Sequence, residues 1–348
     1  IAHSIYCGMT LWGCRMRQFS LCLMLPLLAA TETHNVLPTT YHHTFSRAHA
    51  PAARVRPGDT VVTKALDAGG QDERGARLAE PGNPLTGPFY VEGAEPGDAL
   101  LVRLDRLRLN RNWGWTNFRL LLIALTSDSV EGIYSDRYKP DLIRPGRANM
   151  VPWDIDLERN TVRLREPSSS RVKLEFPVQL MLGCIGVAAP GEFAPTSAIS
   201  GPYGGNLDYS EVVEGATVIL PVYHPGALLY LGDAHALQAD GEPLGTGIET
   251  SSEIAFTVQL RKRAAPAGPR LENAEYLISV GSQPEFASSL DRALQMATTD
   301  MWRWLVRDYQ LEPWAAHLLI GLHGRYQVVT VAGSMGLKVP KRVLPAAQ

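Results

Sequence analysis

The chain has 348 residues, of which 45% are hydrophobic and 20% are charged, enough apolar side chains for one large core or two to three smaller ones. Its formal net charge of -2 argues against a nucleic-acid partner, because nucleic-acid-binding domains normally present a basic face. The 25 prolines and 31 glycines are spread along the chain as single turn signals, which is typical of proteins built from many short strands.

The first 30 residues resemble a leader and not part of the fold. Arg17 precedes an apolar run at 19–28, and Ala29-Ala30 supplies the small residues of a signal-peptide cleavage site. The run is too short to span a bilayer, so no membrane association is expected after cleavage. The alternative is a buried N-terminal helix, but no amphipathic period supports it. We therefore interpret residues 1–30 as upstream residues and a signal peptide, and predict an exported protein, periplasmic or extracellular.

Cleavage would leave Cys184 as the only cysteine, so no disulfide can form within the exported chain. Cys184 lies in "VQLMLGCIGVAAP", which is apolar on both sides of it. This setting predicts a buried structural thiol and disfavours a nucleophile.

Residues 31–270 follow a strand–turn–strand pattern. The segments "ARVRPGDTVVTKAL" and "YVEGAEPGDALLVRLDRLRL" each alternate around a Pro-Gly-Asp turn, and "GIETSSEIAFTVQL" alternates throughout. Residues 271–348 change period. Ser282 and Glu285 have capping-box spacing, a helical stripe runs from Leu290 to Leu305, a second helix begins at Pro313, and two strands follow. The pattern predicts a mainly β protein with an α+β C-terminal part.

The stretch "YLGDAHALQADGE" at 230–242 is the main candidate for chemistry. If 227–235 is a strand, Asp233 and His235 point to the same side. A carboxylate and an imidazole placed so can hold a divalent metal, or act as a base and its orienter. Alone, such a pair is more often a surface feature.

Other polar residues could converge on the same end of the sheet. Glu242 follows within the motif, and Glu249 opens the next strand. Asp67 ends an apolar strand, while Asn206 and Asp208 follow two glycines, where backbone can approach a ligand closely. For Asp67 and Asp208, turn capping is an equally good interpretation.

These stretches together resemble the acetamidase/formamidase family, in order from about residue 40 to the C-terminus and more weakly after 265. The blocks that carry the resemblance are "PAARVRPGDTVVTKALDAGG", "NPLTGPFYVEGAEPGD", "WGWT", "GCIGVAAP", "YGGNLD", "PGALLYLGDAHALQADGE" and "GIETSSEIAFTVQL". The resemblance implies hydrolysis of short aliphatic amides to a carboxylate and ammonia. It also implies a jelly-roll or β-sandwich-like domain, a β barrel, a small α+β region and a divalent metal, zinc or calcium.

The resemblance also implies roles for individual residues. We assign catalysis to Glu249 and Glu242 and substrate binding to Asn206 and Asp208. The predicted metal ligands are Asp67, Asp233 and His235. The chain departs from the family at Ala239, where a glycine is usual, and in the segment 117–140, which matches no family block.

The leading hypothesis is an exported, metal-assisted amidohydrolase of a small linear amide, with zinc as the preferred metal and calcium possible. No G-x-S-x-G elbow is present to supply a serine nucleophile. The alternative is a secreted β-sandwich binding protein without catalytic activity, which uses the same acids as a structural calcium site. His235 discriminates between them, because imidazole is typical of zinc sites and unusual for calcium. We further expect a homo-oligomer, a dimer.

Overall fold

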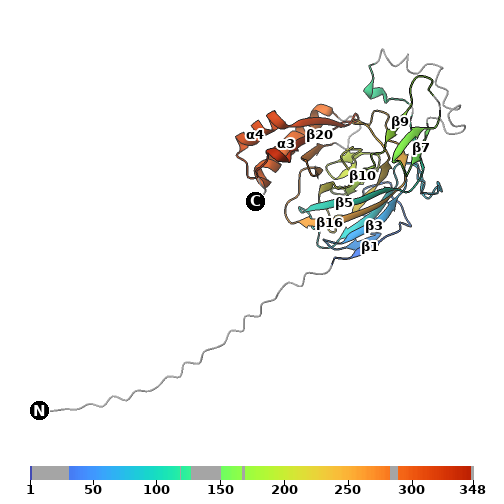
Figure 1. The fold of residues 1–348 in the computed structure, drawn as a ribbon. Coiled ribbons are helices and arrows are strands. Elements are labelled where there is room, and N and C mark those ends of the chain that lie inside the picture. The colour runs from blue at the N-terminus through green and yellow to red at the C-terminus, as the bar shows by residue number, and fades with distance from the viewer. Residues whose placement is uncertain (2–30, 118, 127–149, 167–168, 283–288, 346–348) are drawn as a thin grey trace. The chain divides into compact units, whose positions relative to one another are not determined.

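The computed structural model describes residues 1, 31–117, 119–126, 150–166, 169–282 and 289–345. The predicted signal peptide lies outside the described residues, as does most of the segment 117–140. Residues Thr31–Gln348 form one compact unit, drawn as a ribbon in Figure 1. No described helix is both long enough and apolar enough to cross a membrane.

All twenty described strands of this unit belong to two β-sheets. The first has nine strands in the order β1 (Thr33–Asn35), β3 (Thr60–Ala65), β16 (Ser252–Arg261), β5 (Ala99–Leu109), β13 (Thr217–Pro221), β17 (Arg270–Glu272), β18 (Tyr276–Gly281), β20 (Ser334–Pro340) and β19 (Arg325–Thr330). All its pairings are antiparallel except that of β1 with β3.

The second sheet has eleven strands. Nine follow the order β11 (Ser200–Gly201), β12 (Gly204–Asn206), β10 (Met181–Val187), β14 (Leu229–His235), β15 (Glu249–Thr250), β6 (Trp113–Thr116), β7 (Val151–Asp156), β8 (Thr161–Leu164) and β9 (Glu175–Pro177). In addition, β4 (Leu85–Val91) pairs with β14, and β2 (Ala53–Val55) pairs with β4.

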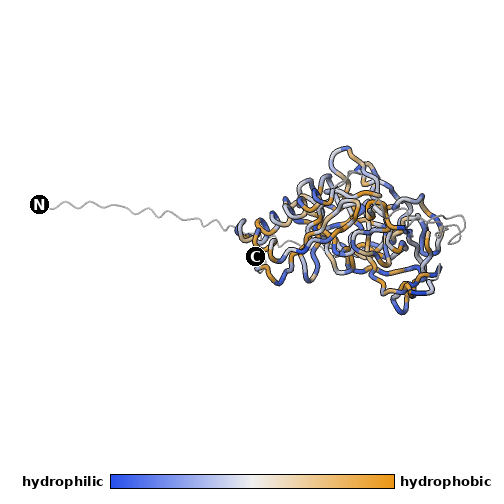
Figure 2. The backbone as a smooth tube through the Cα atoms, turned by 90° about the horizontal axis from the view of Figure 1, so that it is seen from above, coloured by the Kyte–Doolittle hydropathy of each residue, from blue (hydrophilic) through white to orange (hydrophobic). Residues whose placement is uncertain are grey.

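The two sheets share one hydrophobic core. Strand β3 alternates between buried and half-buried residues, as its period-two sequence predicts, whereas every residue of β10 and β14 is buried. Phe89 of β4 meets Phe256 of β16 edge to face, with ring centroids 5.2 Å apart, and so joins one sheet to the other. Figure 2 shows hydrophobic stretches running through the middle of the unit.

Two helices follow in the C-terminal region. Helix α3 (Leu290–Asp308) is capped by Ser289, whose side chain accepts from the backbone N–H of Arg292. Its apolar stripe packs with Leu277 and Leu337 of β18 and β20, and α4 (Pro313–His323) joins the same cluster. Helix α3 begins after the predicted capping box of Ser282 and Glu285. Glu285 lies outside the described residues. Short 3-10 turns span Leu122–Ala124 and Lys341–Val343.

The predicted class, mainly β with helices in the C-terminal region, is confirmed. Neither sheet closes on itself among the described strands, so the expected barrel-like part is an open sheet. Strands β17 to β20 extend the sheet that begins with β1 and β3. The division into 31–270 and 271–348 stays a prediction.

Candidate metal centre and active site

Strand β14 carries Asp233 and His235, the two residues that the sequence motif singled out. Its apolar residues are fully buried, and the strand ends at His235, as predicted. Asp233 has a φ of 57°, in the left-handed region that few non-glycine residues adopt. Its carboxylate lies over Gly183 of β10, where a Cβ would stand 2.7 Å from Asp233 Oδ2 and 2.4 Å from Asp208 Oδ1. The glycine therefore leaves the space in which the two carboxylates meet.

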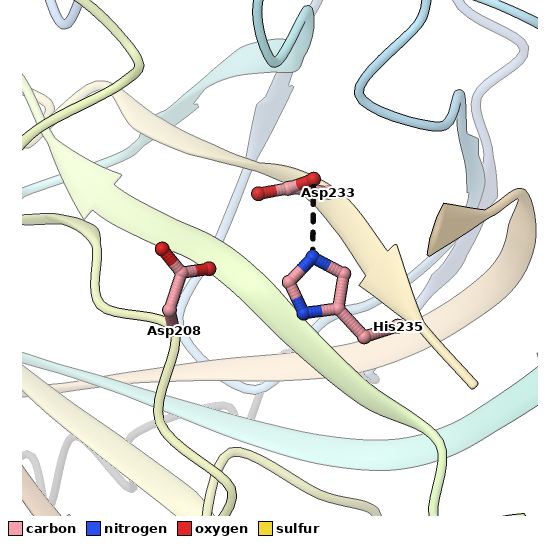
Figure 3. Close-up of side chains that lie close together, drawn as sticks. All are labelled: Asp208, Asp233 and His235. Carbon is pink, nitrogen blue, oxygen red and sulfur yellow. Dashed lines mark ion pairs between the residues drawn. The ribbon is translucent and has the colours of Figure 1, made fainter. Parts of the chain in front are cut away.

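Three further acids reach the same place from other elements. Asp208 follows β12, and its backbone N–H donates to the carbonyl oxygen of Gly183. Glu249 lies on β15, directly opposite His235 in the antiparallel register. Glu242 comes from the turn between these two strands. Figure 3 shows the Asp208 and Asp233 carboxylates pointing toward the His235 ring.

The polar tips are close enough to share one cation. His235 Nε2 lies 3.4 Å from Asp233 Oδ1 and 3.1 Å from Glu249 Oε1. Two overlapping groups have ligand atoms within 4.8 Å of one another: Asp208 with Asp233 and His235, and His235 with Glu242 and Glu249. Because both groups include the same imidazole, they form a single centre with up to five possible metal ligands.

Several atoms of this centre are buried without a hydrogen-bond partner among the described residues. They are Asp208 Oδ1, Asp233 Oδ1, His235 Nε2 and Glu249 Oε2. A buried charged group without a partner costs several kcal/mol, so natural proteins pair it or let it coordinate a metal. The orphaned atoms converge, and a divalent cation would satisfy all of them.

Burial and the closeness of the charged groups also shift the pKa values of the centre. Burial, followed by the charge of Glu242, raises the pKa of Asp208 well above its usual value. Burial likewise raises the pKa of Glu242 and Glu249 to about 8 each. Burial alone would lower the pKa of His235, but the facing carboxylates of Glu249 and Asp233 raise it well above 6.5. Four carboxyl groups packed around one imidazolium cannot all stay ionised unless further positive charge is present, and a bound cation would supply it.

The centre opens into a cavity of about 560 Å³. Asn206, Asp208, Asp233, Glu242 and Glu249 all line it, whereas the ring of His235 lies behind them. Apolar wall residues include Trp115, Met150 and Ile199. The cavity is of the size class of small-molecule sites.

Backbone strain concentrates around this cavity. Nine described residues other than glycine have a φ in the left-handed region. Four of them line the cavity, namely Asn83, Asp208, Asp233 and Glu242. Residues in such sparsely populated conformations cluster at functional sites, where the surrounding structure holds them in place.

The structure does not bring Asp67 into the centre, although the sequence placed it among the metal ligands. Asp67 Oδ2 accepts from Arg111 Nη2 at 2.7 Å and from Trp115 Nε1 at 3.2 Å, and Oδ1 accepts from the backbone N–H of Gln71 at 2.8 Å. Both partners of the ion pair are buried. The neighbours Ala68 and Gly69 line the cavity, but the carboxylate is used in holding Arg111.

Sequence reasoning left several residues of the centre without a role. Asn83 Nδ2 donates to Asn206 Oδ1 and to Asp233 Oδ2, each at 3.0 Å. Gln238, inside the motif, contacts His235 Nδ1 at 2.6 Å. The position of Gln238 inside the motif was a sequence signal for its role. No comparable signal marked Asn83.

Cys184 is buried and free, as predicted, but its surroundings are not wholly apolar. Its thiol donates to Asn206 Oδ1 at 2.7 Å and lies 3.8 Å from Asp233 Oδ2. Burial and then the charge of Asp233 raise the pKa of Cys184 well above its usual value, which keeps the group a thiol. A thiol is a poor nucleophile, in agreement with a structural role.

The donor set fits a divalent metal. One imidazole with several carboxylates is typical of zinc and other first-row ions, whereas calcium prefers oxygen ligands alone. Fold and site together therefore define a mainly β protein with a buried acid–histidine centre suited to a divalent cation, at the base of a small-molecule cavity.

Comparison with known proteins finds similarity to one family. Residues 161–291 match the model of the acetamidase/formamidase family. The formamidase of Methylophilus methylotrophus is 28% identical over 251 residues, which cover 60% of this chain and 61% of the relative. The chain spans 56–62% of the lengths of the curated relatives that it matches.

Solved structures agree over more of the chain. An acetamidase from Yersinia enterocolitica is 29% identical with a TM-score of 0.73, and the match covers 90% of this chain and 93% of that one. An acetamidase from Bacillus halodurans is 27% identical with a TM-score of 0.71, covering 88% and 97%. The relationship to the acetamidase/formamidase family that the sequence motifs predicted is confirmed.

Proposed function

We propose that the protein hydrolyses the C–N bond of short linear amides, such as formamide or acetamide, to a carboxylate and ammonia with the help of a divalent metal. The observation that carries this proposal is the convergence of four buried ligand atoms without a hydrogen-bond partner beside a small-molecule cavity. The formamidases and acetamidases among its relatives support the choice of substrate class.

Amide hydrolysis is slow because water is a weak nucleophile and the amine is a poor leaving group. A divalent ion held by Asp208, Asp233 and His235 would polarise the amide carbonyl and activate water. Glu249 and Glu242 reach the same centre and can move protons. When the C–O bond forms and the C–N bond breaks, one of these carboxyl groups delivers the proton that the departing nitrogen needs.

The cavity lining supports the remaining assignments. Asn206 presents an amide that can hydrogen-bond a small polar substrate, while its own Nδ2 donates to Asp208. Asp208 was assigned to substrate binding, but its position in the acid–histidine group favours a ligand role. Zinc suits the proposed centre better than calcium because His235 points its unpartnered nitrogen into it. The same feature disfavours a binding protein with only a structural calcium site.

The test is ammonia release from formamide, acetamide and propionamide by the purified protein, before and after chelation and after zinc is restored. We expect turnover that chelation removes and zinc restores. His224→Ala is the matched control for His235→Ala, because the His224 ring hydrogen-bonds the carbonyl oxygen of Ala189 and belongs to neither acid–histidine group. Lack of activity on the whole panel with zinc bound would refute the proposed reaction.

We also propose export, on the strength of the leader-like sequence at 1–30, and self-association as a dimer. An apolar stripe on α4 supports the second proposal. Trp314, Leu318 and Leu322 are 66%, 57% and 77% exposed at four-residue spacing, and α4 carries no charged side chain other than histidine. Large exposed apolar side chains in a row mark contact surfaces.

The occupant that best fits this stripe is a second copy of the chain. Glu312 precedes α4 and Arg325 follows it, and Leu318 lies midway between them. In an antiparallel pairing about a two-fold axis at Leu318, Glu312 of each copy meets Arg325 of the other. The stripe and the charges at its ends are thus self-complementary, as a two-fold interface requires.

A further inference from the structure

Gln238 lies between two members of the proposed metal centre and touches both. Its Oε1 is 2.6 Å from His235 Nδ1, and its Nε2 donates to the backbone carbonyl oxygen of Asp208 at 2.6 Å. The side chain is 8% exposed, so water does not compete for either bond. One amide therefore ties the end of β14 to the loop after β12.

The chemistry of these two bonds determines which ring nitrogen of His235 carries a proton. A backbone carbonyl oxygen can only accept, so the NH₂ end of the Gln238 amide must face Asp208. The carbonyl end then faces His235, and because this oxygen can only accept, Nδ1 must be the donor. In a neutral imidazole the lone pair is consequently on Nε2.

Nε2 is the nitrogen that points into the centre. It lies 3.1 Å from Glu249 Oε1 and 3.4 Å from Asp233 Oδ1, and it forms a hydrogen bond with neither. A lone pair facing carboxylate oxygens is repelled, so either a proton or a metal cation must stand between them. The orientation set by Gln238 is therefore the one that a metal ligand needs.

We propose that Gln238 is a positioning residue of the metal centre, which holds His235 as the Nδ1–H tautomer with Nε2 free to bind a divalent ion. This inference rests on the proposed metal-assisted function for its biological role. It assigns a task to a buried polar side chain of the motif that neither belongs to the acid–histidine groups nor lines the cavity.

Zinc affinity, measured by chelator competition, tests the proposal in three variants. Gln238→Met keeps the length of the side chain but removes both hydrogen bonds, and we expect it to weaken zinc binding about 10- to 100-fold, as outer-shell substitutions do. Gln238→Glu keeps an acceptor for Nδ1–H and should bind zinc at least about ten times more tightly than Gln238→Met. Gln179→Met is the matched control, because Gln179 Nε2 donates to the carbonyl oxygen of Ser210 in the same loop without touching His235.

A second readout needs no metal. In zinc-free protein labelled with ¹⁵N-histidine, the Nδ1–H proton of His235 is expected as a sharp resonance protected from exchange with water, assigned by its loss in His235→Ala. Gln238→Met should broaden it and Gln179→Met should not. Unchanged zinc affinity and an unchanged resonance in Gln238→Met would overturn the proposal. Gln238 would then have only a packing role. If zinc does not bind at all but the resonance depends on Gln238, the metal-assisted function fails while the positioning role stands.

Discussion

His235 and Glu249 face each other across the β14–β15 ladder, with Nε2 and Oε1 3.1 Å apart, although 14 residues separate them in sequence. The two strands hold the imidazole and the carboxylate at fixed positions before any ligand arrives. A metal site built on a sheet in this way needs little reorganisation on binding, which strengthens its affinity. The behaviour of this centre can be tested by substitution and by metal removal.

Asp233→Asn should remove activity and zinc binding while leaving the fold intact. Asparagine tolerates the left-handed φ of 57° at this position and has nearly the same shape, but it lacks the charge that binds the cation. We expect zinc affinity to fall more than about 100-fold, beyond the effect of an outer-shell change. Asp240→Asn, on the exposed side chain that accepts from Ser210, should retain wild-type affinity and activity. A fully active Asp233→Asn protein would exclude this residue as a ligand.

Removal of the metal should lower stability as well as activity. A ligand that binds only the folded state raises the free energy of unfolding by mass action, by about 2.7 kcal/mol at 100 times its dissociation constant. Denaturant unfolding with zinc and after chelation measures this difference. The difference should vanish in His235→Ala and persist in His224→Ala. Equal stability with and without zinc, at a concentration that saturates binding, would contradict a site formed by the native fold.

Asp67→Asn should separate the structural from the metal-binding interpretation of that residue. The substitution breaks the buried ion pair with Arg111 Nη2 and leaves a buried guanidinium unbalanced. Breaking such a pair costs about 3–5 kcal/mol of stability. Zinc affinity of the folded variant should be unchanged, because Asp67 lies outside the acid–histidine groups. Loss of zinc binding at unchanged stability would restore Asp67 to the ligand set.

Asp59, in the first Pro-Gly-Asp turn, should contribute to acid sensitivity. Burial opposes the charge of its carboxylate, but the backbone N–H of Arg56 and the imidazole of His34 hold the pKa of Asp59 at about 2, below the usual 3.8. A depressed folded-state pKa stabilises the protein above the unfolded pKa, and that stability is lost as pH falls toward 2. Asp59→Asn should therefore cost on the order of 1 kcal/mol near pH 7.

The measurement is the unfolding free energy of wild type and Asp59→Asn between pH 7 and pH 3. The gap between them should be constant above about pH 5 and shrink below pH 4. Asp291→Asn, on the exposed first turn of α3, should show no such gap. If the difference in unfolding free energy does not depend on pH, the loss of stability comes from packing and not from charge.

Leu318→Glu should convert the proposed dimer to a monomer, because it places two like charges together on the two-fold axis of the α4 pairing. Sedimentation velocity gives the oligomeric state directly. Leu37→Glu, at a leucine outside α4 that is 71% exposed, should leave the oligomeric state unchanged. A wild-type protein that sediments as a monomer at all concentrations would refute the interface, as would a Leu318→Glu protein that remains dimeric.

Features that depend on local pattern could be predicted from the sequence. Alternation with period two and regular turn signals predicted the strands, including the buried strand that ends at His235, and a change to helical period predicted the C-terminal helices. Asp233 and His235 were found because two residues two apart on a regular strand are expected to share a side. The distinctive family blocks also lie in contiguous sequence.

Which distant polar groups meet could not be predicted from the sequence and depends on the three-dimensional arrangement of the strands. Asp67 and Glu249 are both acids beside apolar strands, yet the carboxylate of one is neutralised by Arg111, 44 residues away, and that of the other faces His235 across a ladder. Strand periodicity gives the side on which a residue lies but not its partner, because pairing between distant strands depends on the whole sheet order. The tautomer of His235 likewise followed from Gln238 only when the backbone of Asp208, 30 residues earlier, was seen to accept the other end of the same amide.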